Sequence, residues 1–230
     1  MKHIQFLFYI ILTFIFMKEI LFAQDNDWAN LNRYKEENLK IGLPADNENR
    51  VVFIGNSITQ GWIEVNPNFF VGKSYINRGI SGQTTPQMLV RFRSDVVNLK
   101  PKVVVILAGT NDIAGNTGPS TLEMIEDNIA SMVEIANANN IKAVLCSILP
   151  AYDYPWKTGL EPAQKIVDLN KWIKEYALKN EIIYVDYFTL MADQRNGLKK
   201  EYSEDGVHPN LAGYKVMEPI VENAIAEALR

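Results

Sequence analysis

Residues 51–59 read Val-Val-Phe-Ile-Gly-Asn-Ser-Ile-Thr, and they contain the clearest signal of the fold. Its first part, Val51–Gly55, is an uninterrupted apolar run, which is typical of a strand in a sheet covered on both faces. The glycine, asparagine and serine that come next predict a tight turn directly into a helix. The stretch is therefore a strand-turn-helix unit with a serine hydroxyl at the turn.

Four further segments rich in valine and isoleucine predict four more strands. They cover residues 74–77, 102–109, 141–148 and 182–187. Between the strands, apolar residues recur at helical spacing, which predicts amphipathic crossover helices. These residues are Met88, Phe92, Val96 and Leu99, then Leu122, Ile125, Ile129 and Met132, then Ile166, Leu169, Ile173 and Tyr176.

Local signals also predict where particular helices begin and end. Thr85 stands before Pro86, a pairing that predicts a helix N-cap followed by proline at the first helical position. We expect an opening helix over residues 28–40 and a final helix from about residue 211. Pro219 should kink that final helix or end it early, because proline lacks the N–H that a helix interior needs.

Strands and helices that alternate five times predict an α/β fold, a three-layer doubly wound sandwich around a five-stranded parallel sheet. The expected strand order is the flavodoxin-like 2-1-3-4-5. In such a sheet the functional site lies at the carboxyl ends of the strands that flank the switch point. Here those are the first and third strands, so the loops after Gly55 and Gly109 become the candidate site.

Composition bounds the class of protein. The chain has 230 residues, 47% hydrophobic and 22% charged, which fits one globular domain and excludes a disordered or collagen-like chain. We assign that domain to residues 24–230. The formal net charge of −4, with no basic tract, argues against nucleic acid as a partner. The sequence leaves the oligomeric state open.

The first 23 residues predict a secretory signal peptide outside the domain. Residues 6–17 are apolar except for Thr13, and Ala23 stands where a signal peptidase would cut. We therefore expect a secreted or periplasmic protein with no stable membrane insertion after cleavage. An uncleaved anchor is the alternative, although the run is shorter than the roughly 20 residues that cross a bilayer.

Counts of cysteine and histidine limit the chemistry. Cys146 is the only cysteine, so an internal disulfide is excluded, and its apolar neighbours predict a small buried side chain rather than a reactive thiol. The only histidines are His3, inside the predicted signal, and His208. One histidine and no cysteine cluster predict no metal site, and we expect no cofactor.

Ser57 and His208 are the candidate nucleophile and base. A serine at a tight turn that opens a helix presents its hydroxyl and lies at the positive end of the helix dipole. His208 follows Asp205 in a long stretch without helical or strand periodicity, and the Asp-x-x-His spacing lets the carboxylate fix one imidazole tautomer. The alternatives are that Ser57 only caps a helix and that His208 is a surface residue beside a turn.

Acyl transfer also needs hydrogen-bond donors for a developing oxyanion. The Asn111 side chain after the third strand, the backbone N–H of Ser57 and a glycine in residues 77–84 are candidates. Gly79 and Gly82 both lie in that loop. Alternatively, Asn111 and Asp112 are caps and the glycines are ordinary turn residues.

Four of these blocks together resemble the SGNH (GDSL-type) hydrolases, most closely their platelet-activating-factor acetylhydrolase-like branch. The blocks are residues 55–57, the Gly82 loop, residues 109–112 and Asp205-x-x-His208, and the resemblance extends from about residue 51 to residue 214. It implies Ser57, His208 and Asp205 as nucleophile, base and orienting acid, and Ser57, Gly82 and Asn111 as oxyanion donors. The family's usual aspartate before the serine is Asn56 here, where we expect altered loop geometry rather than lost activity.

These residues predict a serine esterase that forms an acyl-enzyme on Ser57. Three aromatic residues are tentative substrate-binding residues: Trp62, Tyr154 and Trp156. They either stack on a sugar ring or close the core. We expect short acyl groups, acetyl above all, on carbohydrates. The alternatives are a lysophospholipase, platelet-activating-factor acetylhydrolase-like or thioesterase activity and, more remotely, a non-catalytic carbohydrate-binding domain.

Overall fold

The computed structural model describes residues 27–230, so the predicted signal peptide lies outside the described residues. Five parallel strands form one sheet in the order β2-β1-β3-β4-β5. The strands are β1 (Val51–Gly55), β2 (Tyr75–Gly79), β3 (Val103–Leu107), β4 (Lys142–Cys146) and β5 (Ile183–Val185). The predicted α/β class and strand order are therefore confirmed, with strand ends that differ from the expected ones by a few residues.

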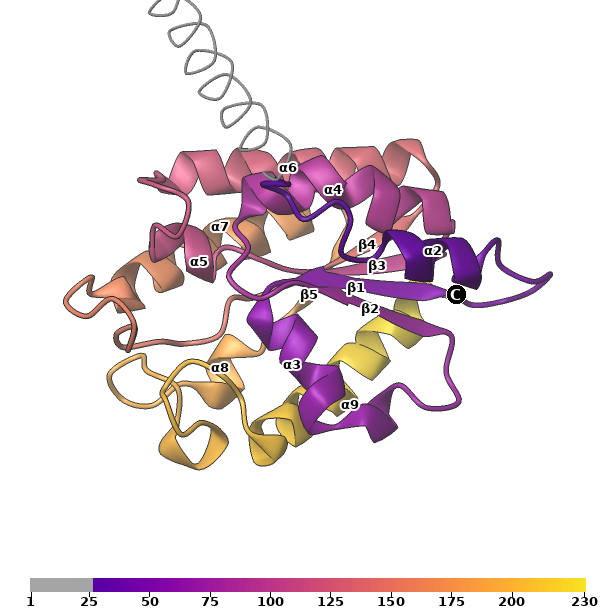
Figure 1. The fold of residues 1–230 in the computed structure, drawn as a ribbon. Helices are drawn as coiled ribbons and strands as arrows, with labels where there is room; N and C mark the ends of the chain where they lie inside the picture. The colour runs from indigo at the N-terminus through magenta and orange to yellow at the C-terminus, as the bar shows by residue number, and fades with distance from the viewer. Residues whose placement is uncertain (1–26) are drawn as a thin grey trace, which may run out of the picture.

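Helices cover both faces of the sheet and make three layers (Figure 1). One face carries α2 (Lys35–Ile41), α4 (Thr85–Asp95), α5 (Thr110–Ile113), α6 (Leu122–Ala138) and α7 (Pro162–Lys179). The other carries α3 (Ser57–Val65), α8 (Phe188–Met191) and α9 (Leu211–Ala228). Three short 3-10 helices complete the described part: η1 (Pro67–Phe69), η2 (Val97–Leu99) and η3 (Lys200–Tyr202).

Alternate residues of each central strand build two separate cores. In β1, Val52 and Ile54 pack in the core under α4, α6 and α7, while Val51 and Phe53 pack in the core over α3 and α9. Every residue of β1 and β3 is buried, as expected for parallel strands with both faces covered. Burying one valine, isoleucine, leucine or phenylalanine side chain stabilises the fold by roughly 1.5–3 kcal/mol relative to leaving that side chain exposed. The resulting sheet holds the loops at its carboxyl edge in place.

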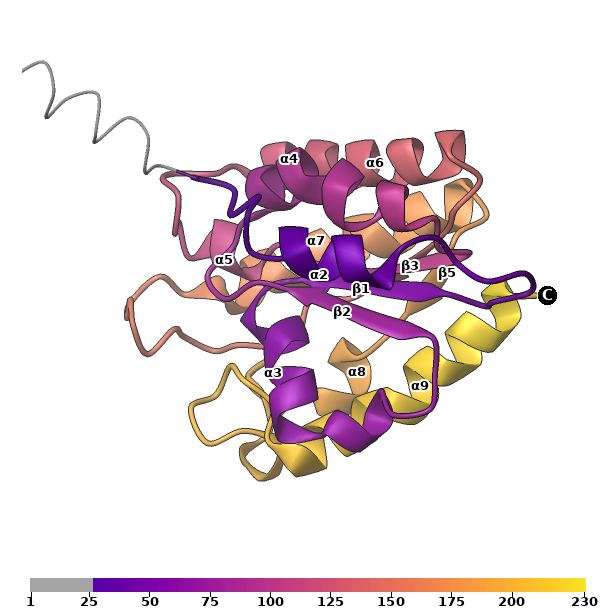
Figure 2. The ribbon, with the colours of Figure 1, turned by 45° about the vertical axis from the view of Figure 1, so that its right-hand side comes forward.

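The opening helix is shorter than predicted, and the reason is local. The Asp27 carboxylate accepts the backbone N–H groups of Leu31 and Asn32, at 2.8 Å each, and Asn30 adopts a left-handed φ of 53°. These contacts stabilise turns through residue 34, so α2 begins only at Lys35. Figure 2 shows the segment crossing from those turns into α2 on the α4 side of the sheet.

Two other predicted helix ends need correction. The N-cap of α4 is Thr84 rather than Thr85, because the Thr84 and Gln87 side chains form a reciprocal capping box. Pro219 does not end α9, which continues to Ala228. Residue 219 is exposed, so its ring can be accommodated on the solvent side of the helix. None of the described helices is long and apolar enough to span a bilayer.

Candidate active site

Ser57 is the first residue of α3, directly after β1, as predicted. The Asn56 side chain caps this helix by accepting the backbone N–H of Ile58 at 3.0 Å. Residue 55 must be glycine here, because a Cβ would lie 2.1 Å from Thr59 Oγ1 and 2.8 Å from Leu107 O. Asparagine and aspartate both cap helices well, so the departure at residue 56 keeps the turn that presents the serine.

His208 lies beside Ser57 although 151 residues separate them in the sequence. His208 Nε2 is 2.9 Å from Ser57 Oγ, and His208 Nδ1 is 2.6 Å from Asp205 Oδ2. The structure thus brings the three predicted residues into one continuous chain of hydrogen bonds. The stretch that delivers His208 is less irregular than predicted, because it includes α8 and η3.

The Asp205 carboxylate is held ionised. Partial burial acts to raise its pKa, but the His208 side chain and the backbone N–H groups of His208 and Val207 lower it to about 2. Those two backbone groups donate to Asp205 Oδ1 at 2.8 and 2.9 Å. An ionised carboxylate accepts from Nδ1–H, which leaves Nε2 without a proton and able to accept the Ser57 hydroxyl proton.

The predicted oxyanion donors converge on the same place. Asn111 lies on α5 after β3, and its Nδ2 donates one hydrogen to Gln83 O at 2.9 Å, which leaves a second hydrogen. Within residues 27–230, the backbone N–H groups of Ser57 and Gly82 donate to no other protein group. Gly82 has a φ of +77°, a backbone conformation that side chains rarely allow.

A small pocket joins these groups. It measures about 200 Å³ and is lined by Ser57, Ser81, Gly82, Asn111, Asn116, Trp156 and His208. The Trp156 ring stacks on Tyr154 with centroids 5.1 Å apart and lies 5.9 Å from the His208 ring. Trp156 is 45% exposed, so one of its faces can still receive a ligand.

Two of the three tentative substrate-binding residues, Trp62 and Tyr154, are buried and do not line this pocket. Trp62 is 2% exposed and stacks between Phe69 and Tyr214 in the core over α9. Tyr154 is fully buried, with its hydroxyl 2.9 Å from Thr110 Oγ1. Tyr154 therefore packs against the Trp156 ring, and of these three aromatic residues only Trp156 lines the pocket.

Sequence reasoning assigned no role in the site to two residues that support it. Asn116 Nδ2 donates to Gly82 O at 3.1 Å, and Asp112 accepts both the backbone N–H and the hydroxyl of Thr85. Asp112 is next to Asn111 in the third block, so the motif itself could have drawn attention to it. No local signal marks Asn116.

Other chemistry is limited in the part of the chain that the structure describes. There, no group of three or more histidine, cysteine, aspartate or glutamate side chains could hold a metal ion. Burial raises the pKa of Cys146 to about 12, which agrees with the predicted inert thiol.

Comparisons with known proteins agree with the geometry. The model of the GDSL-like Lipase/Acylhydrolase family matches residues 53–216. The crystal structure of a GDSL-like lipase from Bacteroides thetaiotaomicron superposes with a TM-score of 0.86 at 48% identity, over 88% of this chain and all of that one.

Two curated relatives are more distant. An acetylxylan esterase of Xylanibacter ruminicola is 28% identical over 222 residues, which cover 80% of this chain and 45% of the relative. The human platelet-activating factor acetylhydrolase IB subunit alpha2 is 30% identical over 115 residues, 48% of each chain. This chain spans about half the length of those relatives or less. Because the family model covers most of the chain, the protein belongs to the GDSL-like lipase/acylhydrolase family.

Proposed function

We propose that this protein is an exported serine esterase that removes short acyl groups, acetyl above all, from carbohydrates. Ser57 is the nucleophile, His208 the general base and Asp205 the group that orients His208. The observation that carries this proposal is the unbroken hydrogen-bond chain Ser57–His208–Asp205 beside a pocket with unused donors.

The mechanism follows from the order of these atoms. His208 Nε2 takes the proton of Ser57 Oγ as that oxygen bonds to the ester carbonyl carbon. The carbonyl oxygen becomes an oxyanion that accepts from the backbone N–H groups of Ser57 and Gly82 and from the free Nδ2 hydrogen of Asn111. Protonated His208 then gives its proton to the leaving alcohol. Water, activated by His208, releases the acid from the acyl-enzyme.

Pocket size and surroundings support a short acyl group on a sugar. A volume of about 200 Å³ accommodates an acetyl group and the ester linkage but is small for a long alkyl chain. The half-exposed Trp156 ring beside His208 offers an aromatic face of the kind that stacks on sugar rings. The acetylxylan esterase among the relatives supports the same substrate class.

The nucleophile is tested with p-nitrophenyl acetate. We expect hydrolysis by the wild-type chain and loss of at least about 10³-fold in kcat for Ser57→Ala, since the acyl-enzyme cannot form. Ser131→Ala, at a helix position in α6 away from the pocket, is the matched control. Equal hydrolysis by Ser57→Ala and the wild type would overturn Ser57 as the nucleophile, whereas no hydrolysis by the wild type would favour the non-catalytic carbohydrate-binding domain.

The substrate is tested with an acyl-chain series and acetylated polysaccharides. Rates should fall from acetyl to octanoyl p-nitrophenyl esters, and acetate should be released from acetylated xylan, sialic acid or pectin fragments. Trp156→Ala should raise KM on the carbohydrate esters more than on p-nitrophenyl acetate. Rates that rise with chain length would favour the lysophospholipase, platelet-activating-factor acetylhydrolase-like or thioesterase alternative.

Export rests on residues 1–23, whose apolar run and Ala23 fit a cleaved signal peptide. Expression of the full chain in a bacterial host tests it. The mass of the exported protein should correspond to a chain that begins at residue 24, whereas an intact chain in the membrane fraction would indicate an anchor.

A further inference from the structure

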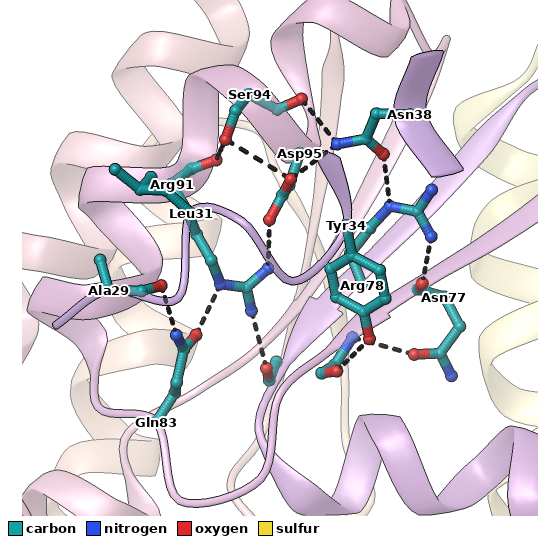
Figure 3. A network of polar contacts seen from close by, with 12 residues as sticks. Ala29, Leu31, Tyr34, Asn38, Asn77, Arg78, Gln83, Arg91, Ser94 and Asp95 are labelled. Carbon is teal, nitrogen blue, oxygen red and sulfur yellow. Dashed lines mark hydrogen bonds and ion pairs between the residues drawn. The ribbon is translucent and has the colours of Figure 1, made fainter. Parts of the chain in front are cut away.

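A buried arginine lies under the loops that carry the proposed oxyanion donors (Figure 3). Arg91, on α4, is fully buried. Its Nε donates to Gln83 Oε1 at 2.5 Å, and its Nη2 donates to Gly55 O at 3.1 Å. Its Nη1 pairs with Asp95 Oδ2 at 3.1 Å. One planar guanidinium therefore connects the end of β1 to the loop after β2.

Two of these partners, Gly55 and Gln83, lie close in sequence to proposed donors of the site. Gly55 lies two residues before Ser57, and Gln83 follows Gly82 directly. The backbone carbonyl of Gln83 accepts Asn111 Nδ2 at 2.9 Å, which fixes the orientation of that amide. The Gln83 side chain is held from its other end by donation to Ala29 O at 2.8 Å. Each proposed oxyanion donor is therefore close to a partner of Arg91: Ser57 to Gly55 and Gly82 to Gln83 along the chain, and Asn111 to Gln83 through a hydrogen bond.

The energetics favour a role in geometry over a role in stability. Removing a guanidinium and a carboxylate from water is costly, and replacing a buried ion pair by apolar side chains of similar size is often neutral or stabilising. Arg91 and Asp95 are both at most 1% exposed. Asn38 Nδ2 also donates to Asp95 Oδ1 at 2.8 Å, so the pair is held in a fixed position by several donors. The Arg91–Asp95 pair holds the guanidinium in place, and the guanidinium in turn fixes the distance between the turn after β1 and the loop after β2.

We propose that Arg91 is a positioning residue that sets the distance between the Ser57 turn and the Gly82 loop and so aligns the oxyanion donors. This inference rests on the proposed function. Arg91 touches neither substrate nor the reacting atoms; it acts through Gly55 and Gln83. Lysine cannot replace it, because a single ammonium group lacks the planar fork that reaches Gln83, Gly55 and Asp95 together.

Two variants remove these links without leaving a buried charge unpaired. Gln83→Met keeps the size of the side chain and loses both of its hydrogen bonds, and the double variant Arg91→Met with Asp95→Leu removes the ion pair as a unit. Arg50→Met is the matched control. Arg50 is 4% exposed, pairs with Glu48 and donates to Gly42 O and Leu99 O, at the start of β1 and so at the opposite end of the sheet.

The first readout is kinetic. With p-nitrophenyl acetate, we expect kcat per folded molecule to fall about 10- to 100-fold in both variants with KM nearly unchanged, because small displacements of oriented groups affect the transition state most. The inhibition constant of a trifluoromethyl ketone, which forms a tetrahedral adduct with serine, should rise by the same factor. Arg50→Met should lower only stability. Wild-type kcat in both variants, or an equal fall in Arg50→Met, would overturn the proposal.

The second readout does not need enzymatic activity. Crystal structures of the two variants should show the Gly82 backbone and the Asn111 amide displaced relative to Ser57. An unchanged arrangement would overturn the positioning role even if kcat falls. Should the wild type show no Ser57-dependent hydrolysis, the proposed function fails by itself, and these structures still decide whether Arg91 sets the loop geometry.

Discussion

At the scale of single residues, Ser57 depends on atoms contributed by loops far apart in the chain. Its hydroxyl lies 2.9 Å from His208 Nε2, and the side chain of Asn111 shares its pocket. The Asp205 pKa of about 2 keeps that carboxylate ionised across the neutral range, so it remains an acceptor for the His208 Nδ1–H there. Small side-chain changes at these positions should affect rate more than stability.

Asn111→Ala tests the proposed oxyanion site directly. Losing one donor should lower kcat by roughly 10²- to 10³-fold, or about 3 kcal/mol, with little change in KM, because the contact forms only in the transition state. Steady-state kinetics with p-nitrophenyl acetate measure both constants. Asn98→Ala, on η2 away from the pocket, is the control. A rise in KM with normal kcat would instead assign Asn111 to ground-state binding.

Asp112 makes stability depend on pH. Burial raises its pKa to about 6, although hydrogen bonds from Thr85 act in the opposite direction. The folded state therefore holds the proton more tightly than the unfolded state, whose pKa is the ordinary 3.8. Ionisation costs the fold stability as pH rises from about 4 to 6, by roughly 3 kcal/mol in all.

Asp112→Asn should remove that dependence. The variant's free energy of unfolding minus that of the wild type should increase by roughly 3 kcal/mol between pH 4 and pH 7 and then level off. Urea denaturation at several pH values measures this difference, in which the other titrating groups cancel. A difference that stays constant across the range would contradict the assignment.

At the scale of elements, β2 is the strand at the sheet edge beside α2, and side chains occupy part of that edge. Tyr34 donates its hydroxyl to Gly79 O, and Arg78 Nη1 donates to Asn77 O at 2.7 Å. The Asn77 side chain accepts Gly79 N–H at 2.9 Å. These contacts satisfy backbone groups that would otherwise be open to pairing with another strand, which protects the edge.

Pro219 inside helix α9 allows a test of how much this proline destabilises the helix. Pro219 leaves Lys215 O without its helical partner and crowds it, so Pro219→Ala should raise the free energy of unfolding by up to about 3 kcal/mol. Urea denaturation measures the change. Asn223→Ala, exposed on the same helix, should change stability by only a few tenths of a kcal/mol. A destabilised Pro219→Ala variant would mean that the core requires a bend at this position.

At the scale of the whole molecule, residues 27–41 complete the fold although the family match begins only at residue 53. The segment supplies Trp28 O to Gln87, Ala29 O to Gln83 and the Asn38 side chain to Arg78 and Asp95. These partners are buried, so they depend on this segment for their hydrogen bonds.

A chain without residues 1–41 should therefore be less stable than one that begins at residue 24. Each buried polar group left without its partner costs roughly 1–3 kcal/mol, so the midpoint of urea unfolding should fall clearly. Activity per folded molecule should fall as well, because Gln83 loses its contact with Ala29. Equal midpoints for the two chains would show that the segment is a passive extension.

The amino-acid pattern alone predicted most of the elements and the candidate reactive groups. Apolar periodicity is a local property, so it located the strands and helices, and their regular alternation predicted the layers and the strand order. The short motifs around Ser57, Asn111 and His208 marked residues that line the pocket. Gly82 was found through its place in the motif, and its left-handed φ of +77° favours glycine.

The surroundings of those groups depend on how distant segments pack together. Trp62 and Trp156 look alike in the sequence, yet one lies in the core and the other lines the pocket, because burial depends on which helices pack over them. Arg91 has an ordinary place on an amphipathic helix, and its link between two loops exists only once α4 packs under them. The local sequence pattern determines which helix or strand a residue belongs to, whereas contacts between distant segments determine which residues surround it.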